Sequence, residues 1–192
     1  YEFHKIDICN NERIKDVIDN CKPSLIINFA AESHVDNSID NPLEFINTNI
    51  LGVGNLLYNS FNYYKNLSND NRNKFKFIHI STDEVFGSLD ANDDKFSENS
   101  KYFPSSPYAA SKASSDHLVL SWYTTYGLPV IVTNCSNNYG PYQFPEKLIP
   151  RMIINCIKEN KLPIYGNGKN IRDWIFVKDH CDAIMNISLN GK

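Results

Sequence analysis

The chain has 192 residues, of which 42% are hydrophobic and 21% are charged, and its formal net charge is −3. This composition is typical of a globular protein, and the length is sufficient for one sizeable core. The weak negative charge and the lack of a basic run argue against nucleic acid and anionic membranes as partners. No apolar stretch reaches the roughly 20 residues of a membrane-spanning helix, so we expect no membrane association.

The cysteines indicate a reducing environment. They are Cys9, Cys21, Cys135, Cys156 and Cys181, an odd and scattered set without a C-x-x-C pair. Such a pattern fits neither a disulfide framework nor a zinc site. We therefore expect reduced thiols, a cytoplasmic location and no metal.

Short apolar runs alternate with longer helical patterns along the chain. The predicted strands are residues 3–8, 25–29, 75–80, 130–134 and 171–177, and the predicted helices are residues 12–20, 42–65, 108–126, 147–158 and 180–189. Asn11 is the predicted N-cap of the first helix. Alternating strands and helices indicate βαβ units, so the sequence predicts an α/β fold with a doubly wound, mostly parallel Rossmann-type sheet.

Polar and small residues follow four of the predicted strands, in residues 7–9, 30–40, 81–87 and 135–142. In such a sheet, ligands bind beyond the carboxyl ends of the strands. We therefore expect these four segments to form one composite site.

The glycines pose a question about the start of the sheet. A dinucleotide-binding sheet normally begins with a strand and a Gly-rich turn at a helix N-terminus. The first of the eight glycines is Gly52. We expect either that the cofactor is absent or that the chain is N-terminally truncated by about 50 residues, the size of one strand–helix–strand start.

The spacing Tyr-x-x-x-Lys occurs three times, and one copy opens a predicted helix. The copies that begin at Tyr1 and Tyr165 fall in a predicted strand and in a glycine-containing turn. Tyr108 and Lys112 share a helix face, so the ammonium can lie near the phenol. We expect Lys112 to lower the Tyr108 pKa below its usual value of about 10. The alternative is a surface aromatic beside a solvated lysine.

Two adjacent carboxylates, Asp83 and Glu84, follow Ser81 and Thr82 at the end of a predicted strand. Neighbouring carboxylates repel and titrate as a coupled pair, so one can act as an acid while the other acts as a base. The alternative is an ordinary solvated loop. We expect the pair to be held near the sheet, because apolar residues and a glycine follow it.

These segments resemble the extended short-chain dehydrogenase/reductases, and more narrowly the nucleotide-sugar 4,6-dehydratases of the dTDP-glucose type. The resemblance runs over essentially the whole chain. The narrow assignment rests on Asp83, because related 4-epimerases lack the Asp-Glu pair and related decarboxylases carry serine at the aspartate position.

The resemblance implies NAD-dependent dehydration of dTDP-glucose to dTDP-4-keto-6-deoxyglucose, through C4 oxidation, C5/C6 water elimination and C6 reduction. Tyr108, supported by Lys112, would take the C4 hydroxyl proton, with Thr82 orienting that oxygen. Glu84 would remove the C5 proton, and Asp83 would protonate the departing C6 hydroxyl.

The resemblance also implies two sets of binding residues. Those for NAD would be Asp7, Ile8, Phe29, Ala30, Ala31, Glu32, Thr48, Tyr108, Lys112 and Asn138. Those for the nucleotide sugar would be Ser33, Thr82, Asn137, Lys147, Leu148, Pro163, Ile164, Tyr165 and Arg172. Arg172, placed on a predicted strand, would clamp the pyrophosphate, and its alternative is a surface ion pair.

We further expect an NAD-binding domain at residues 1–142 without its Gly-rich first unit, the start of a smaller substrate-binding domain at residues 143–192, and a homodimer in the full-length protein. Because the resemblance leaves out the family's first turn and roughly the last third of its substrate domain, we expect the 192-residue chain alone to be inactive. Two alternatives stay open: UDP-glucose as the substrate, or a catalytically silent subunit that binds NAD or a nucleotide sugar.

Overall fold

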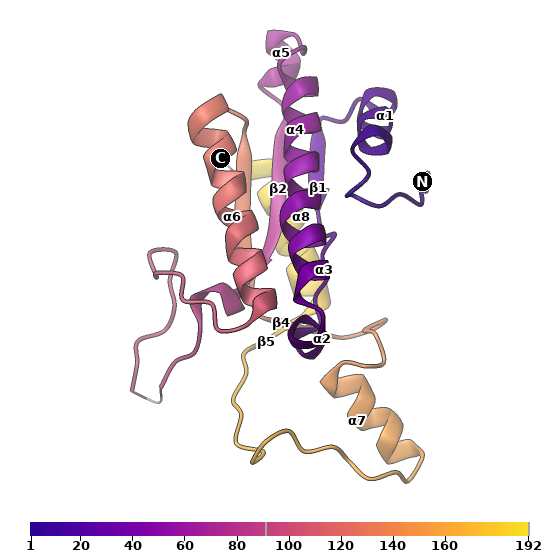
Figure 1. Ribbon diagram of the computed structural model, residues 1–192, viewed down its shortest axis with the longest axis vertical. Coiled ribbons are helices and arrows are strands. Elements are labelled where there is room, and N and C mark those ends of the chain that lie inside the picture. Colours follow the sequence, from indigo (N-terminus) through magenta and orange to yellow (C-terminus); the bar gives the residue numbers. More distant parts are fainter. Residues whose placement is uncertain (91, 192) are drawn as a thin grey trace. The chain divides into compact units, whose positions relative to one another are not determined.

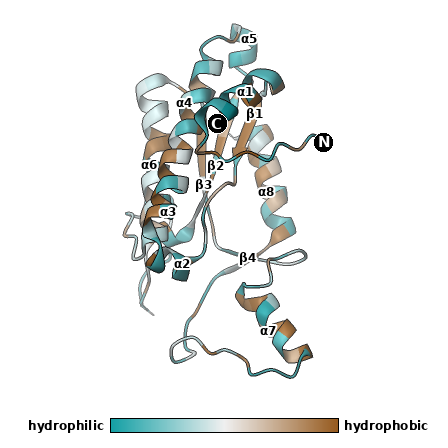
Figure 2. Cartoon of the chain, turned by 45° about the vertical axis from the view of Figure 1, so that its right-hand side comes forward, coloured by the Kyte–Doolittle hydropathy of each residue, from teal (hydrophilic) through white to brown (hydrophobic). Residues whose placement is uncertain are grey.

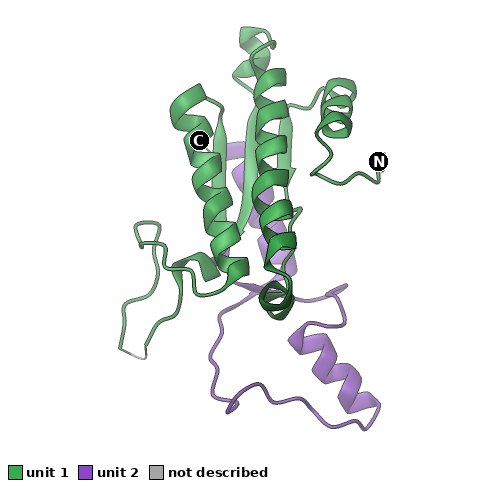
Figure 3. Cartoon of the chain, in the orientation of Figure 1, with its two compact units in different colours: residues 1–134, 192 green, residues 135–191 purple. Residues whose placement is uncertain are grey.

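The computed structural model describes residues 1–90 and 92–191, and the chain divides into two compact units (Figure 3). Unit 1 spans residues 1–134 and unit 2 spans residues 135–191. The expected division at residue 142 concerns which part binds NAD and which part binds the sugar nucleotide, and it stays a prediction.

Unit 1 is built on a three-stranded sheet in the order β1-β2-β3. The strands are β1 (Leu25–Asn28), β2 (Lys76–Thr82) and β3 (Val130–Cys135). Strands β1 and β2 run parallel, with Leu25 opposite Lys76 and Ile27 opposite Ile78. The connections between the strands are helical, which confirms the predicted α/β class with parallel pairing.

The helices of unit 1 cover the sheet and lead from strand to strand. They are α1 (Asn11–Cys21), α2 (Val35–Asp40), α3 (Pro42–Ile46), α4 (Val53–Tyr64), α5 (Asn69–Arg72) and α6 (Pro107–Tyr126), with a π-helix η1 (Asn47–Gly52) and a 3-10 helix η2 (Asp83–Phe86). Figure 1 shows α4 and α6 side by side in front of the strands. None of the helices in the described residues has the length and apolar character that crossing a membrane requires.

Side-chain caps define where several of these helices begin. Asn10, rather than the predicted Asn11, is the N-cap of α1, because its Oδ1 accepts a hydrogen bond from the Arg13 amide at 3.1 Å. Ser106 caps α6 in the same way through the Ala109 amide at 3.0 Å, with Pro107 at the first helical position. A proline there loses no helical hydrogen bond, since the first amides of a helix have no partner inside it.

The predicted single helix at residues 42–65 forms three consecutive segments, α3, η1 and α4. The π-helical turn carries Asn49, which is buried and whose amide bonds to the backbone of Glu32 and to Ser111. Single π-helical turns are common where a side chain serves a functional site.

Two other predictions for unit 1 are wrong. Residues 3–8 form no strand, because a strand needs a paired neighbour and the described residues offer none on this side. Residues 35–40 form α2 instead of a loop, and the His34 ring caps it by accepting a hydrogen bond from the Asn37 amide at 3.4 Å.

Unit 2 contains two short strands and two helices. They are β4 (Asn137–Tyr139), β5 (Trp174–Phe176), α7 (Leu148–Ile157) and α8 (Val177–Asn190), and β4 pairs with β5 in parallel. The strand predicted at 171–177 is therefore shorter, and Arg172 lies in the preceding loop instead of on a strand. Gly140 follows β4 with φ +138°, and a Cβ there would approach Val177 Cγ1 to 2.8 Å. Only glycine fits this turn.

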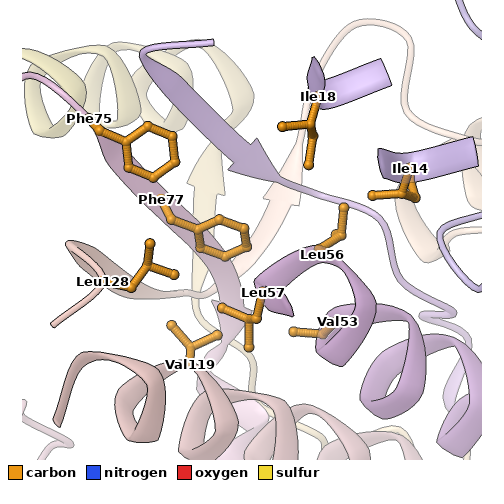
Figure 4. Close-up of a cluster of buried hydrophobic side chains, with 9 residues drawn as sticks. All are labelled: Ile14, Ile18, Val53, Leu56, Leu57, Phe75, Phe77, Val119 and Leu128. Carbon is orange, nitrogen blue, oxygen red and sulfur yellow. The ribbon is translucent and has the colours of Figure 1, made fainter. Parts of the chain in front are cut away.

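The hydrophobic core of unit 1 lies between the strands and helices α1, α4 and α6 (Figure 4). Its buried members are Ile14, Ile18, Val53, Leu56, Leu57, Phe75, Phe77, Val119 and Leu128. Figure 2 shows hydrophobic colour on the strands of unit 1 and hydrophilic colour on much of α1 and α5. Burial of this cluster fixes α6 against β2, and with it the residues that both elements carry.

A histidine interrupts the apolar side chains of β2. His79 is 0% exposed. Burial is the main cause that lowers its pKa; the nearby Lys112 charge acts in the same direction, and the nearby Asp116 carboxylate opposes both. The folded protein therefore keeps this imidazole neutral at pH values where an unfolded chain protonates it.

This histidine makes stability depend on pH. An unfolded histidine has a pKa near 6.5, so its contribution to the free energy of unfolding is fully present above about pH 6.5 and is lost as the pH falls towards the lower folded value. We expect His79→Gln to show a shallower loss of stability than wild type as the pH falls below about 6.5 in urea unfolding. His4→Gln, at an exposed position, serves as the control. Equal slopes for wild type and His79→Gln would contradict the prediction.

Candidate active site

The two predicted carboxylates lie where β2 passes into η2. Thr82 ends the strand, is almost fully buried, and accepts a hydrogen bond from the Glu84 amide at 3.3 Å through Oγ1. The same hydroxyl lies 3.3 Å from Asp83 Oδ1, to which it donates. Asn134 in turn donates to the Thr82 carbonyl oxygen at 3.1 Å. The hydrogen bonds of Thr82 thus fix the backbone that carries Asp83 and Glu84.

A glycine closes the short helix behind the acids. Gly87 has φ +91°, and a Cβ at this position would approach the Phe103 carbonyl oxygen to 2.6 Å. The Phe103 amide donates to the Val85 carbonyl at 2.9 Å, and the Val85 side chain is buried. The expectation that the pair is held near the sheet is confirmed, and the solvated-loop alternative is wrong.

The Tyr108–Lys112 pair lies in the first turns of α6 and is buried, with exposed fractions of 9% and 3%. Lys112 Nζ donates to the Ile80 carbonyl oxygen at 2.8 Å. The ring of Phe45 meets the Tyr108 ring edge-on, with centroids 6.3 Å apart at 79°. Lys112 is therefore not a solvated surface lysine.

The two sets of acid/base groups belong to one place in unit 1. Ile80, which receives the Lys112 ammonium, stands two residues before Thr82 on the same strand, and α6 contacts η2. A phenol and an ammonium one helical turn apart suit the oxidation of a carbinol, and two adjacent carboxylates suit the loss of water.

The residues after β1, expected to meet the cofactor, form an open surface with a fixed backbone. Phe29 is 59% exposed and Ala30 is exposed. Asn49 holds the next residues, because its Oδ1 accepts from the Glu32 amide and its Nδ2 donates to the Glu32 carbonyl, both at 2.9 Å. The same Nδ2 lies 2.9 Å from Ser111 Oγ, which ties this segment to α6.

Asp7, Ile8 and Thr48 belong to a second group of expected cofactor residues. Asp7 Oδ1 accepts a hydrogen bond from the Cys9 amide at 2.8 Å, which closes a turn. The Ile8 side chain packs on Gly52, where a Cβ would lie 2.7 Å from its Cδ1. Gly52 ends η1, the segment that carries Thr48, so the turn and η1 lie against each other.

The groups present in unit 1 have the chemistry that NAD requires. An exposed carboxylate at Asp7 suits ribose hydroxyls, and small side chains at Ala30 and Ala31 let a flat ring approach the backbone. A buried phenol and ammonium at Tyr108 and Lys112 supply polar groups for a second ribose. The residues therefore fit a dinucleotide.

The expected site residues of unit 2 lie on three different segments. Asn137 and Asn138 form β4, Lys147 and Leu148 begin α7, and Pro163, Ile164, Tyr165 and Arg172 lie in the loop before β5. The Asn138 side chain meets His180 Nδ1 at 2.8 Å, and Asn137 donates to the Asp173 carbonyl at 3.2 Å. Both amides therefore hold β4 in place.

The loop residues of unit 2 differ in how they are held. Arg151 Nη1 donates to the Tyr165 hydroxyl at 3.1 Å, which ties that loop to α7. Arg172 is exposed and its Nη1 donates to the neighbouring Ile171 carbonyl at 2.9 Å. Within the part of the chain that the structure describes, no group of three or more His, Cys, Asp or Glu side chains is arranged to hold a metal ion.

Sequence analysis missed the polar residues beneath the site. His79, Ser115 and Asp116 are buried beside Lys112, and Asn49 holds the cofactor segment. The missed signals were a histidine inside an apolar strand and an aspartate four residues after Lys112, which places both on one helix face.

Comparison with known proteins identifies the relatives of this chain. A dTDP-glucose 4,6-dehydratase of Neisseria meningitidis serogroup B is 53% identical over 191 residues, which cover 100% of this chain and 54% of that protein. One from Haemophilus influenzae is 50% identical over 192 residues, covering 100% of this chain and 57% of that protein. The chain thus spans about half the length of the relatives it matches.

Solved structures agree with these relatives. A Bacillus anthracis dTDP-glucose 4,6-dehydratase in complex with NAD has a TM-score of 0.86 and 45% identity, over 100% of this chain and 56% of that one. A Streptomyces venezuelae dTDP-glucose 4,6-dehydratase with NAD bound has a TM-score of 0.89 and 40% identity, over 100% and 55%. The family model described as GDP-mannose 4,6 dehydratase matches residues 1–192. The resemblance seen in the sequence is confirmed: the chain belongs to the GDP-mannose 4,6 dehydratase family.

Proposed function

We propose that the full-length protein catalyses the NAD-dependent dehydration of dTDP-glucose to dTDP-4-keto-6-deoxyglucose. The observation that carries this proposal is the 2.8 Å hydrogen bond from Lys112 Nζ to the Ile80 carbonyl, which brings α6 to the strand end that bears Asp83 and Glu84. The relatives named dTDP-glucose 4,6-dehydratase support the choice of substrate. A silent binding subunit has no need of two acids beside a tyrosine–lysine pair.

The first stage uses the groups of α6 and β2. NAD, when bound, supplies reversible hydride exchange with the sugar. Tyr108 accepts the proton of the C4 hydroxyl, and the Lys112 ammonium favours the phenolate form that can do so. Thr82 helps to orient the same sugar oxygen.

The second stage uses the adjacent carboxylates. The C5 proton becomes acidic once C4 is a ketone, and Glu84 removes it. Asp83 donates a proton to the C6 hydroxyl, which leaves as water while the C5–C6 double bond forms. Asp83 and Glu84 are neighbours in the short 3-10 helix η2, so their titrations are coupled. Glu84 must be ionised at the start of this stage and Asp83 must be protonated, and the coupling favours such a division.

The binding residues follow from the same proposal. The proposed NAD contacts are Asp7, Ile8, Thr48, Asn138 and residues 29–32. The proposed contacts of the nucleotide sugar are Ser33, Asn137, Lys147, Leu148, Pro163, Ile164, Tyr165 and Arg172. A guanidinium such as that of Arg172 suits a pyrophosphate because its planar fork binds two oxygens together.

The substrate is tested with the full-length protein. We expect dTDP-glucose to lose one water by mass and to yield a 4-keto product, without net accumulation of NADH, because each hydride taken from C4 returns to C6. UDP-glucose is assayed in parallel. Stoichiometric NADH without a dehydrated product contradicts the proposal, a larger kcat/KM with UDP-glucose favours the UDP alternative, and no turnover with either favours a silent subunit.

The role of Glu84 is tested by a near-isosteric change. Glu84→Gln keeps the shape of the side chain but cannot accept the C5 proton, so we expect kcat to fall by at least about 10²-fold, the usual scale for a general base. Glu98→Gln is the matched control, because Glu98 is exposed in the loop between η2 and α6. Near wild-type turnover of Glu84→Gln would remove this residue from the mechanism.

A cytoplasmic location belongs to the same proposal. It is supported by the five cysteines, which are all free thiols in the structure, as expected for a protein kept in a reducing compartment.

We further propose that the full-length protein is a homodimer. Apolar side chains of Tyr58 on α4 and of Leu120 and Tyr123 on α6 are exposed, and these two helices lie side by side. We expect light scattering to give twice the monomer mass, and Tyr123→Glu to shift the equilibrium towards monomer. Leu89→Lys, at an exposed position in the loop after η2, is the control. A monomer at micromolar concentration would refute the assignment.

A further inference from the structure

A chain of buried polar groups lies beneath the Tyr108–Lys112 pair. Asp116 follows Lys112 by one helical turn and is 0% exposed. The His79 ring lies between them, with Nε2 3.4 Å from Lys112 Nζ and 3.4 Å from Asp116 Oδ1. An ammonium and a carboxylate, both buried, thus flank one imidazole.

The neighbours of His79 determine where its proton resides. The Ala30 amide donates to Asn28 Oδ1 at 3.0 Å, which orients the Asn28 amide group. Asn28 Nδ2 therefore donates to His79 Nδ1 at 3.1 Å, so Nδ1 is the acceptor and Nε2 carries the hydrogen. Nε2 lies 3.2 Å from Ser115 Oγ, which can accept this hydrogen.

This tautomer of His79 determines which acceptor the Lys112 ammonium binds. Because His79 Nε2 is a donor, the Lys112 ammonium cannot donate to it and turns to the Ile80 carbonyl oxygen at 2.8 Å. Ser115 completes the arrangement, since its hydroxyl donates to the Lys112 carbonyl oxygen at 2.8 Å. The lysine is thereby held at both its backbone and its ammonium.

Asp116 fixes the same cluster from the other side. Its Oδ2 accepts hydrogen bonds from Ser81 Oγ at 2.7 Å and from the Tyr102 hydroxyl at 3.0 Å. Burial, and secondarily Asp116, raises the pKa of Tyr102 to about 12, so this phenol remains a donor. The carboxylate joins β2, α6 and the loop before α6.

We propose that His79 and Asp116 are positioning residues that fix the Lys112 ammonium on the Ile80 carbonyl and so keep the Tyr108–Lys112 pair in its working geometry. The kinetic consequence rests on the proposed function, whereas the hydrogen-bond directions do not. Neutralising one of two buried charges leaves the other uncompensated, so loss of the Asp116 charge must disturb Lys112.

The tautomer of His79 gives a test in the wild-type protein that needs no variant and no activity. In ¹⁵N-edited NMR of the full-length protein at neutral pH, we expect the His79 ring to carry its proton on Nε2 and to bind none on Nδ1. A ring protonated on Nδ1 would reverse the chain of donors and overturn the proposal.

Variants test the effect on the reaction. Asp116→Asn keeps the shape but removes the charge, and we expect kcat to fall about 10²-fold, the scale of a misplaced catalytic group, while KM for the sugar nucleotide changes little. His79→Gln keeps a donor near the Nε2 position, so it should retain more kcat than His79→Leu. Asn59→Ala is the control, because Asn59 is a buried amide that bonds to Asn11 at the contact of α4 with α1.

The outcomes separate the two proposals. Wild-type kcat in Asp116→Asn, equal loss in His79→Gln and His79→Leu, or an equal kcat loss in Asn59→Ala at matched thermal stability would each overturn the positioning role. A wild-type protein without dehydratase activity contradicts the proposed function alone, and the NMR result then decides this proposal.

Discussion

The hydrogen bond between the Lys112 ammonium and the Ile80 carbonyl oxygen constrains how unit 1 can assemble. Lys112 is 3% exposed, and its ammonium is costly to bury unless the donors find acceptors. Helix α6 docks on β2 in a register that presents the Ile80 carbonyl oxygen to this side chain. The same register brings α6 into contact with η2, which directly follows the strand end at Thr82.

Parallel pairing explains why the functional residues meet although the sequence separates them. β1 and β2 run in the same direction, so their carboxyl ends lie at one edge of the sheet. The segment after β1 then lies near the acids after β2, and Asn49 and Ser111 fix that segment to α6. The helices that connect the strands bring these segments to one edge of the sheet, and the side-chain amide of Asn49 holds the segment after β1 in place.

Sequence patterns could predict what depends on neighbouring residues. The helix at residues 108–126 has a serine cap and a proline at its first position, and the strand at residues 75–80 is mostly apolar. Each element therefore appeared within two residues of its predicted limits. These sequence signals depend only on neighbouring residues, and the helix and the strand that they predict are both present in the structure.

Features that depend on distant residues could not be predicted. Residues 3–8 have a strand-like composition, but no composition supplies the paired neighbour that a strand requires. The π-helical turn at η1 reflects contacts of Asn49 with Glu32 and Ser111, which are far away in the sequence. His79 and Asp116 could not be recognised from the sequence, because their importance depends on the contact between β2 and α6, which brings the two side chains within 3.4 Å of each other.

The polar face of α6 departs from what stability alone would favour. Ser111, Lys112, Ser115 and Asp116 are all buried on the helix, where apolar residues of similar volume would bury more hydrophobic surface. Replacing buried ion pairs by apolar groups is often neutral or stabilising, so stability does not account for their presence. Natural proteins break local rules mainly where a site needs it. These polar residues of α6 instead give each hydrogen bond around Lys112 a single direction, with the neutral imidazole of His79 between the two charges. A tyrosine–lysine pair needs such fixed directions, because its proton must be held at a defined atom.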